Sequence, residues 1–338
     1  PPAPQQQRHA RDLQVREAEG LLGALPPQLG VAKGLFRGKF VGDWVFPYPR
    51  LSAEQAREAE SVVAEVRAFC DEHLDPVRID READIPREVI DGLARLGVLG
   101  RPAPAIFFTS HHPIGMLPLL LFGSEEQKRR WLPDLVAGRK LAAFALTEPE
   151  AGSDAANVQT QAVPAADGSH YVLTGQKRYI TNGSIADVLT VMARTPVPGR
   201  SETAITAFLV TPDMPGFRVV EPRMEKLGIC GTATARLAFE QMPVPSENVL
   251  GPLGKGLKVA LTVLDFGRTT FGACCTGAAK ACLRLAVEHA RSRRQFGRAL
   301  GEFELVQQKI ARMAMWTYAM EVLTTVTSGL IDRGLEDY

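Results

Sequence analysis

Cysteine is scarce in this sequence, and its spacing excludes two common roles. Only five cysteines occur among 338 residues, and no two of them form a Cys-x-x-Cys pair. Neither a disulfide framework nor a zinc cluster is indicated, because each depends on cysteines at characteristic spacings. A reducing compartment is the favoured interpretation. The five residues are Cys70, Cys230, Cys274, Cys275 and Cys282.

Long apolar runs and an excess of one charge are also missing. The longest apolar run, Met116 to Phe122, contains Pro118 and is far shorter than the about 20 residues that span a bilayer. No transmembrane segment is predicted. The 39 Lys and Arg residues nearly balance 38 Asp and Glu, for a net charge of +1, so that no nucleic-acid partner is indicated.

What the sequence does contain is the composition of an ordinary globular protein. Its residues are 45% hydrophobic and 23% charged, which excludes a disordered or collagen-like chain. The length corresponds to about two to three domains. Residues 1–30 begin at Pro1 and are rich in Gln, Arg, Pro and Ala. They are either the remnant of a transit peptide or a solvated arm, and the arm is the favoured interpretation.

Helical patterns fill the stretch from residue 51 to 138. Ser52 with Gln55, and Ser124 with Gln127, have the capping-box spacing that marks the start of a helix. Between them, apolar residues recur at helical spacings. These residues are Val62, Val66 and Phe69, then Val89, Leu93 and Leu96, with Gly97 as the expected C-cap.

The period changes to two between residues 141 and 251, which predicts a compact antiparallel β domain of six or seven strands. The clearest runs are His170 to Ile180, Val188 to Arg194, Ala204 to Val210 and Thr234 to Phe239. Beyond Gly256 helical patterns return. A seam of residues at alternating spacings of four and three predicts a helix packed in a bundle. Its members are Val306, Ile310, Met313, Thr317, Met320 and Thr324.

The predicted fold class is therefore α+β, with helices, then a β domain, then helices. We expect a flexible arm over residues 1–32, an amino-terminal helical domain over 33–140, a β domain over 141–252 and a carboxy-terminal helical domain over 253–338. We assign Met313, Met315 and Met320 to packing, because methionines at helical spacing usually belong to a core.

Three segments carry possible chemistry. Residues 144–154 place small residues and hydroxyls where a strand ends, which favours a planar ring with an attached phosphate. In residues 177–183, Tyr179 and Thr181 are two apart on a strand and are expected on one face. Residues 291–297 join a cluster of arginines to an aromatic residue and a glycine. Taken alone, the first segment is more often a polar turn and the third a solvated helix end.

In combination, these segments resemble motifs of the acyl-CoA dehydrogenase family, most closely its very-long-chain branch. Residues 144–154 resemble the family's Tyr/Phe-x-x-Thr-Glu-Pro-x-x-Gly-Ser-Asp motif, and residues 177–183 resemble its Lys-x-Trp-Ile-Thr-Asn-Gly strand. Residues 293–297 resemble its Arg-x-x-Phe-Gly element, and residues 243–251 resemble the exit into its last helical domain. The resemblance extends from about Lys33 to Tyr338. It implies the family's three-domain fold, an FAD cofactor and a fatty acyl-CoA substrate.

The resemblance also implies roles for single residues. Residues at the positions of Phe144, Leu146 and Thr147 lie against the isoalloxazine ring in the family, and those of Tyr179 and Thr181 flank its other side. Gly152 and Ser153 match the segment near the pyrophosphate and the pantetheine arm, which makes Ser153 a substrate contact as well. Arg293 and Phe296 would reach the FAD of a neighbouring subunit, which implies a homodimer or a dimer of dimers.

Asp265 and Arg268 match positions that line the acyl-CoA channel. An ion pair between these two residues, three apart on a helix, is an equally supported interpretation. The family reaction removes a proton from C2 and a hydride from C3 of a saturated thioester, and it requires a carboxylate base and donors for the enolate oxygen.

The sequence departs from the family pattern in three places: the catalytic glutamate, the segment that would cover the fatty-acyl chain, and the aromatic residue beside the flavin. The family glutamate follows a Gly-Gly-x-Gly segment that does not occur before Tyr338, and the alternative position before Arg268 holds Gly267. No catalytic residue is nominated, and we expect this stretch alone not to turn over. Glu302, Glu304 and Glu321 are interpreted as surface carboxylates. The segment 101–112 is shorter than usual, so that acyl-chain length cannot be predicted, and Tyr179 replaces the usual tryptophan.

The resemblance implies dehydrogenation of a long fatty acyl-CoA to the trans-2-enoyl-CoA, with electrons passed to an electron-transferring flavoprotein. Two alternatives stay open: a non-catalytic assembly or interaction protein on the same scaffold, and an acyl-CoA oxidase. The expected location is the mitochondrial matrix or the inner-membrane face in a eukaryote, and the cytoplasm in a bacterium.

Overall fold

The computed structural model describes residues 30–36, 38–99, 114–199 and 201–334. These residues belong to two compact units, one within 1–51 and 321–338 and the other within 52–320. The expected arm over residues 1–32 and the short segment 101–112 lie almost wholly outside the described residues. Within the described part, no helix is long and apolar enough to cross a membrane.

The described residues of the smaller unit form two short helices, α2 (Val31–Phe36) and α3 (Gly42–Val45), and the last turns of a long helix, α11 (Glu304–Asp332). Arg333 donates hydrogen bonds to the carbonyl oxygens of Trp44 (3.0 Å) and Asp43 (3.4 Å). Gly329 leaves room for Pro49, since a Cβ there would lie 2.4 Å from the Pro49 ring. These contacts hold the end of α11 to the segment that follows α2.

The larger unit begins with helices, as the sequence predicts. Both capping boxes are confirmed, at the starts of α4 (Ala53–His73) and α9 (Glu125–Val136). Gly97 has a φ of +71° directly after the C-cap of α6 (Arg87–Arg95). Its neighbour Val98 donates from its N–H to the Leu93 carbonyl, as in a Schellman motif. The remaining helices here are α5 (Pro76–Glu82) and α8 (Leu117–Phe122).

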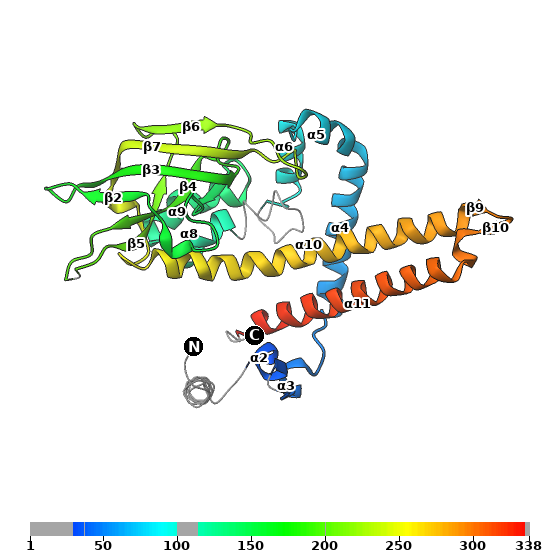
Figure 1. The fold of residues 1–338 in the computed structure, drawn as a ribbon. Coiled ribbons are helices and arrows are strands. Elements are labelled where there is room, and N and C mark those ends of the chain that lie inside the picture. Colours follow the sequence, from blue (N-terminus) through cyan, green and yellow to red (C-terminus); the bar gives the residue numbers. More distant parts are fainter. Residues whose placement is uncertain (1–29, 37, 100–113, 200, 335–338) are drawn as a thin grey trace, which may run out of the picture. The chain divides into compact units, whose positions relative to one another are not determined.

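An eight-stranded sheet follows, with the order β6-β7-β3-β2-β4-β5-β8 and with β1 beside β4 (Figure 1). The strands are β1 (Ala142–Ala145), β2 (Gln161–Pro164), β3 (His170–Thr181), β4 (Val188–Thr195), β5 (Ala204–Val210), β6 (Phe217–Glu221), β7 (Thr234–Pro245) and β8 (Val249–Leu250). Short 3-10 turns cover Ala155–Asn157, Ser246–Asn248 and Leu300–Glu302.

The predicted antiparallel β domain is confirmed in most strand pairs, but the sheet has eight strands rather than six or seven and two of its pairings are parallel. Strand β1 pairs with β4 in parallel, and β2 meets β4 in parallel where Gln161 lies opposite Arg194. Periodicity shows which residues of a strand share a face, whereas pairing between strands distant in sequence depends on the whole sheet. Strand β7 also continues beyond Phe239, to Pro245. Its pairing with β6 stops at Phe239. At Pro243, β7 is therefore paired only with β3, and the missing N–H of proline breaks no hydrogen bond on the other side.

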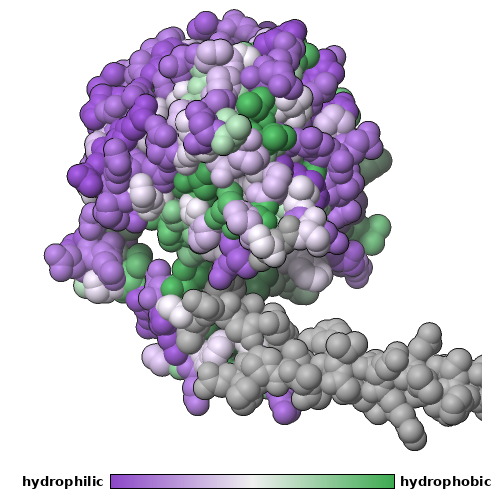
Figure 2. Space-filling model, turned by 90° about the vertical axis from the view of Figure 1, so that its left-hand side faces the viewer, coloured by the Kyte–Doolittle hydropathy of each residue, from purple (hydrophilic) through white to green (hydrophobic). Residues whose placement is uncertain are grey.

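Alternation along the strands builds two cores, one on each face of the sheet. In β4, Val188 and Met192 join a cluster that contains Trp131 of α9, whereas Leu189 and Val191 join a second cluster with Phe208. The first cluster also takes residues from α8 and from the long helix α10 (Gly256–Ser292). On the face drawn in Figure 2, hydrophilic residues predominate and hydrophobic residues show between them.

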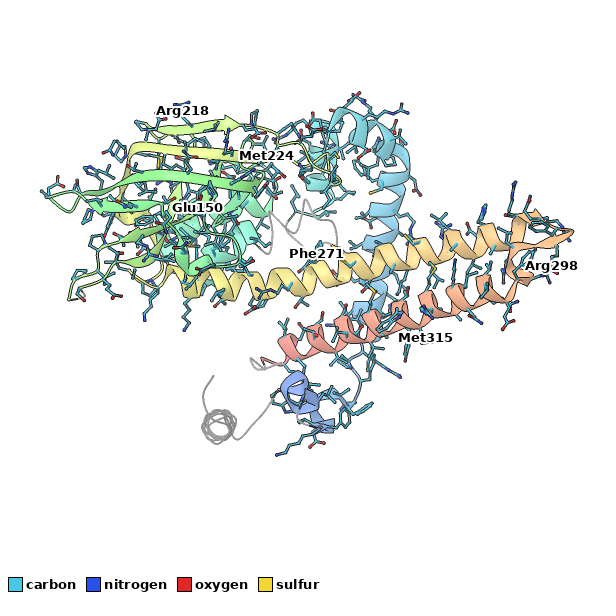
Figure 3. All side chains as sticks on the ribbon, viewed as in Figure 1. Glu150, Arg218, Met224, Phe271, Arg298 and Met315 are labelled. Carbon is cyan, nitrogen blue, oxygen red and sulfur yellow. The ribbon has the colours of Figure 1, made fainter. Side chains whose placement is uncertain are left out.

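Helix α10 starts against the sheet. A Cβ at Gly256 would lie 2.5 Å from the backbone carbonyl carbon of Thr206 in β5, so that only glycine permits this approach. A hairpin of β9 (Arg294–Gln295) and β10 (Arg298–Ala299) then leads into α11. The predicted seam of α11 is buried or half-buried at every position, which confirms it. Met315 is different: its side chain is 68% exposed, because it lies off the seam, and its assignment to packing is wrong (Figure 3).

The predicted order of helices, β domain and helices is confirmed by these elements. The exact domain boundaries stay a prediction.

Candidate functional site

One pocket of the larger unit gathers residues from four separate stretches of sequence, three of which form its main walls. It has a volume of about 370 Å³, within the usual range for a small-molecule site. Seven of the nine residues expected to contact the cofactor line it, together with Arg268 from the expected substrate channel. These seven are Phe144, Leu146, Thr147, Gly152, Ser153, Tyr179 and Thr181.

The first wall is the exit of β1. Strand β1 ends at Ala145, and Phe144 and Leu146 present apolar surface to the pocket. The next residue, Thr147, is held by its backbone, because its carbonyl accepts a hydrogen bond from the Arg178 N–H (2.9 Å). Further along, a Cβ added to Gly152 would meet nothing within 4 Å, so that this position leaves open space.

The second wall is the end of β3, where a bulge changes the expected geometry. The pairing of β3 with β7 shifts register between Lys177 and Ile180, and Tyr179 has a φ of +58°. Strict alternation therefore fails here, and Tyr179, Ile180 and Thr181 all line the pocket. Tyr179 and Thr181 both line the pocket, as expected. They do so because of the bulge, and not because of a regular strand period of two. Bulges re-aim side chains in this way.

The Tyr179 ring is partly open to solvent and lies under a cation. Its side chain is 55% exposed, and the Arg178 guanidinium carbon lies 4.7 Å from the ring centroid. A guanidinium at this distance is attracted by the face of an aromatic ring.

The third wall is one face of α10. Leu261, Leu264 and Arg268 follow one another at spacings of three and four and all line the pocket. Arg268 forms an ion pair with Asp265, which itself does not line the pocket. Arg268 thus lines the pocket and is also the ion-pair partner of Asp265, which lies outside the lining.

The polar groups of the pocket suit a ligand with acceptors and negative charge. The hydroxyls of Thr147, Ser153 and Thr181 have no hydrogen-bond partner among the described residues. Arg268 is the one charged side chain among the described residues of the lining. The free hydroxyls and the guanidinium supply hydrogen-bond donors and a positive charge, and the walls supply apolar surface. This combination suits a flavin ring and an anionic thioester carrier.

A buried ion pair lies directly behind the first two walls. The ammonium of Lys177 is 2.6 Å from a carboxylate oxygen of Glu148, and the two side chains are 0% and 3% exposed. Burial lowers the pKa of Lys177 to about 8, although Glu148 opposes this shift. Burial alone would raise the pKa of Glu148, but the Lys177 charge and hydrogen bonds from Lys177, Thr160 and Gln159 outweigh it, so that this pKa lies below its ordinary value.

Arg293 and Phe296 do not line this pocket. Arg293 is the C-cap of α10, and Phe296 occupies the tip of the following hairpin with a φ of +52°. The Phe296 side chain is 93% exposed and touches Phe303, with ring centroids 6.3 Å apart. Figure 3 marks the neighbouring Arg298, which lies over the Phe303 ring. Both predicted residues thus face solvent in the single chain.

No carboxylate lines the pocket among its described residues. Gly267 is buried in α10, and a Cβ there would lie 2.9 Å from the Ile114 side chain. Glu302 and Glu304 are exposed, as expected, and Glu302 accepts a hydrogen bond from the Ala299 N–H (2.8 Å). Glu321 is half-buried.

Comparisons with known proteins show the family to which the chain belongs. Three profiles of the acyl-CoA dehydrogenase family match: the N-terminal domain over residues 56–107 and 101–139, the middle domain over 143–242 and the C-terminal domain over 254–337. The chain is 37% identical to the human mitochondrial very long-chain specific acyl-CoA dehydrogenase, over 91% of this chain and 52% of that protein. It therefore spans about half the length of this curated relative.

Two solved structures are similar as well. Butyryl-CoA dehydrogenase from Megasphaera elsdenii has a TM-score of 0.77 and 32% identity, over 85% of this chain and 81% of that one. An acyl-CoA dehydrogenase complexed with FAD from Bacillus anthracis has a TM-score of 0.75 and 34% identity, over 85% and 53%. The chain belongs to the acyl-CoA dehydrogenase family, and the resemblance and fold class inferred from the sequence are confirmed.

Several lining residues were missed from the sequence. Leu261 and Leu264 could have been found, because they precede Arg268 on the same face of a helix. Ile114, Ala155 and Ile180 carry no such signal. Lys177 and Glu148 lie inside the quoted motifs, but their pairing across about thirty residues of sequence depends on how β1 meets β3.

Proposed function

We propose that this chain carries the FAD and acyl-CoA sites of a very-long-chain-type acyl-CoA dehydrogenase. The reaction is the α,β-dehydrogenation of a long fatty acyl-CoA to the trans-2-enoyl-CoA, in fatty acid β-oxidation. The observation that carries the proposal is the pocket itself, which unites seven residues that belong to the family motifs.

The residues present fit a flavin. Phe144, Leu146 and Tyr179 offer apolar and aromatic surface to a planar ring, and Thr147 and Thr181 offer hydroxyls that no described residue occupies. Gly152 and Ser153 leave room for the phosphate-bearing part, since a side chain at Gly152 would point into open space. When bound, FAD supplies the two-electron acceptor for the hydride that leaves C3.

The remaining tasks fall to the protein. Arg268 brings a positive charge to the pocket, and Asp265 orients its guanidinium. The apolar side chains of Leu261 and Leu264 keep water from one side of the pocket. We nominate no residue for the removal of the C2 proton, because the described lining contains no carboxylate.

We further propose the partners that follow from the family. Arg293 and Phe296 serve the FAD of a second subunit in a homodimer or a dimer of dimers, which agrees with their exposure in the single chain. An electron-transferring flavoprotein would take the electrons. A mitochondrial matrix or inner-membrane location applies to a eukaryotic source and the cytoplasm to a bacterial one.

The test is the visible spectrum of the purified chain before and after anaerobic addition of palmitoyl-CoA. Flavin absorbance that bleaches supports both the cofactor and the reaction. Flavin absorbance that persists supports the FAD site and contradicts turnover by this chain. A protein that stays colourless after reconstitution with FAD overturns the proposal, and rapid recovery of colour in air identifies an oxidase instead.

A further inference from the structure

The buried ion pair of Lys177 and Glu148 touches the pocket wall through the backbone. Besides its contact with Glu148, the Lys177 ammonium donates a hydrogen bond to the carbonyl oxygen of Leu146 (3.1 Å). Leu146 and Thr147 both line the pocket. Lys177 thus connects the wall formed by the β1 exit to β3, one position before the N–H of Arg178 binds Thr147.

The Glu148 carboxylate extends this network to a third segment. It accepts hydrogen bonds from the backbone N–H of Gln159 (2.6 Å) and of Thr160 (3.1 Å), and from the Thr160 hydroxyl (2.6 Å). The hydroxyl approaches because β3 has a glycine opposite it: a Cβ at Gly175 would lie 2.7 Å from Thr160 Cα. One pair of charges therefore ties the β1 exit to β3 and to the chain just before β2.

Stability alone is a weak reason for such a pair. Removing two charges from water is costly, and replacing a buried ion pair by neutral side chains is often neutral or stabilising. What a neutral pair lacks is a donor fixed on a carbonyl and an acceptor that holds two neighbouring N–H groups. This pair has both, and both act on the segment that forms the pocket wall.

We propose that Lys177 and Glu148 are positioning residues, which fix the backbone of residues 146–148 so that the wall of the pocket has the shape that FAD requires. This inference rests on the proposed function. It concerns how the wall is held, and neither residue lines the pocket.

The experiment uses Lys177→Met, Glu148→Gln and the double variant in the purified chain. FAD affinity is measured by quenching of flavin fluorescence at a temperature where each variant is folded by circular dichroism. We expect the affinity to fall about tenfold or more in each single variant, as the loss of a hydrogen bond to a charged group predicts. In the double variant, thermal stability should recover while the affinity stays low.

A matched control removes a cation that does not touch the wall. Arg218 on β6 pairs with Glu240 at 2.6 Å, and both side chains are more than half exposed. Arg218→Met also exchanges a basic residue for methionine in a cross-strand pair (Figure 3). It should leave FAD affinity unchanged. FAD affinity equal to that of the unmodified chain in folded Lys177→Met, or recovery of both stability and affinity in the double variant, would overturn the positioning role.

Hydrogen–deuterium exchange separates this inference from the proposed function. In Lys177→Met, we expect faster exchange at the amides of Glu148, Ala151 and Arg178, and unchanged exchange in β4 and β5. Exchange that rises equally everywhere, or that stays as slow at these three amides as in the unmodified chain, refutes the positioning role whether or not FAD binds. Absence of FAD binding by the unmodified chain refutes the proposed function.

Discussion

The pocket and the hairpin tip carry different motifs of the same family, and they differ in how they are held. Behind the pocket wall, Lys177 and Glu148 are buried and paired with each other. Most of the lining comes from the β1 exit, the end of β3 and α10 of one chain. At the hairpin, Arg293 and Phe296 are exposed, and the nearby helix α11 leaves Leu305, Met315 and Trp316 more than 60% exposed.

The pocket and the hairpin tip therefore have different requirements: the first needs only the fold of one chain, and the second needs a partner surface under the proposed function. The pocket is shaped by folding of a single chain, because its walls are tied together by hydrogen bonds within the sheet. Among the described residues, the hairpin tip is supported by its own short β9–β10 pairing and by the contact of Phe296 with Phe303. In the proposed assembly, a second subunit would cover Arg293 and Phe296 and give them their function. Four substitutions test this contrast.

The largest effect is expected from Lys177→Met. It leaves the Glu148 carboxylate buried without its counter-ion, which should lower the free energy of unfolding by about 3–5 kcal/mol. Urea denaturation followed by circular dichroism measures the change. Arg284→Met on α10, which removes one partner of an exposed ion pair, should have a much smaller effect. Equal losses of unfolding free energy in the two variants would show that the buried ion pair contributes no more to stability than the exposed one.

Gly152→Leu should affect binding rather than folding. The new side chain enters open space at the pocket, so that the melting temperature should stay within a few degrees of that of the unmodified chain. FAD affinity should fall by about 1–3 kcal/mol, or roughly fivefold to 150-fold. Gly277→Leu, at an exposed position of α10 that is equally free of neighbours, serves as the control. Unchanged affinity in Gly152→Leu would place the flavin elsewhere.

Glu148→Gln should reduce the loss of folding stability that the protein shows at acid pH. Because the pKa of Glu148 is lower in the folded protein than in the unfolded chain, the unfolded chain binds a proton first as the pH falls. The charged carboxylate thus contributes stability above its unfolded pKa, and this contribution is lost as the pH falls through the folded pKa. Urea midpoints at pH 7 and about pH 3 should differ less in the variant than in the unmodified chain. An identical difference would show that another group governs acid stability.

The smallest effect on stability is expected from Phe296→Ala. A side chain that is 93% exposed should change the free energy of unfolding by less than about 0.5 kcal/mol. FAD retention should nevertheless fall, and it should do so in the oligomer separated by sedimentation velocity rather than in the monomer. A loss of FAD that is equal in both species would contradict the proposed contact between subunits.

Much of the architecture could be predicted from local patterns. The two capping boxes, the seam of α11 and the runs that became β4 and β5 follow directly from periodicity and from side-chain hydrogen bonding within one turn. The parallel pairing of β1 with β4 could not be predicted this way, since more than forty residues separate their partners. The bulge at Tyr179 is also set by pairing with β7 and has no local pattern of its own.

The candidate site divides along the same line. Residue identity and order alone predict the family, the pocket-wall residues that lie in motifs, and the lack of a glutamate at Gly267. The folded structure was needed to show that Thr147, Tyr179 and Arg268 meet in one pocket, that Met315 is exposed and that Lys177 is paired with Glu148 behind the wall. Such contacts join residues far apart in the chain, and their energies depend on burial, which only the folded sheet and helices create.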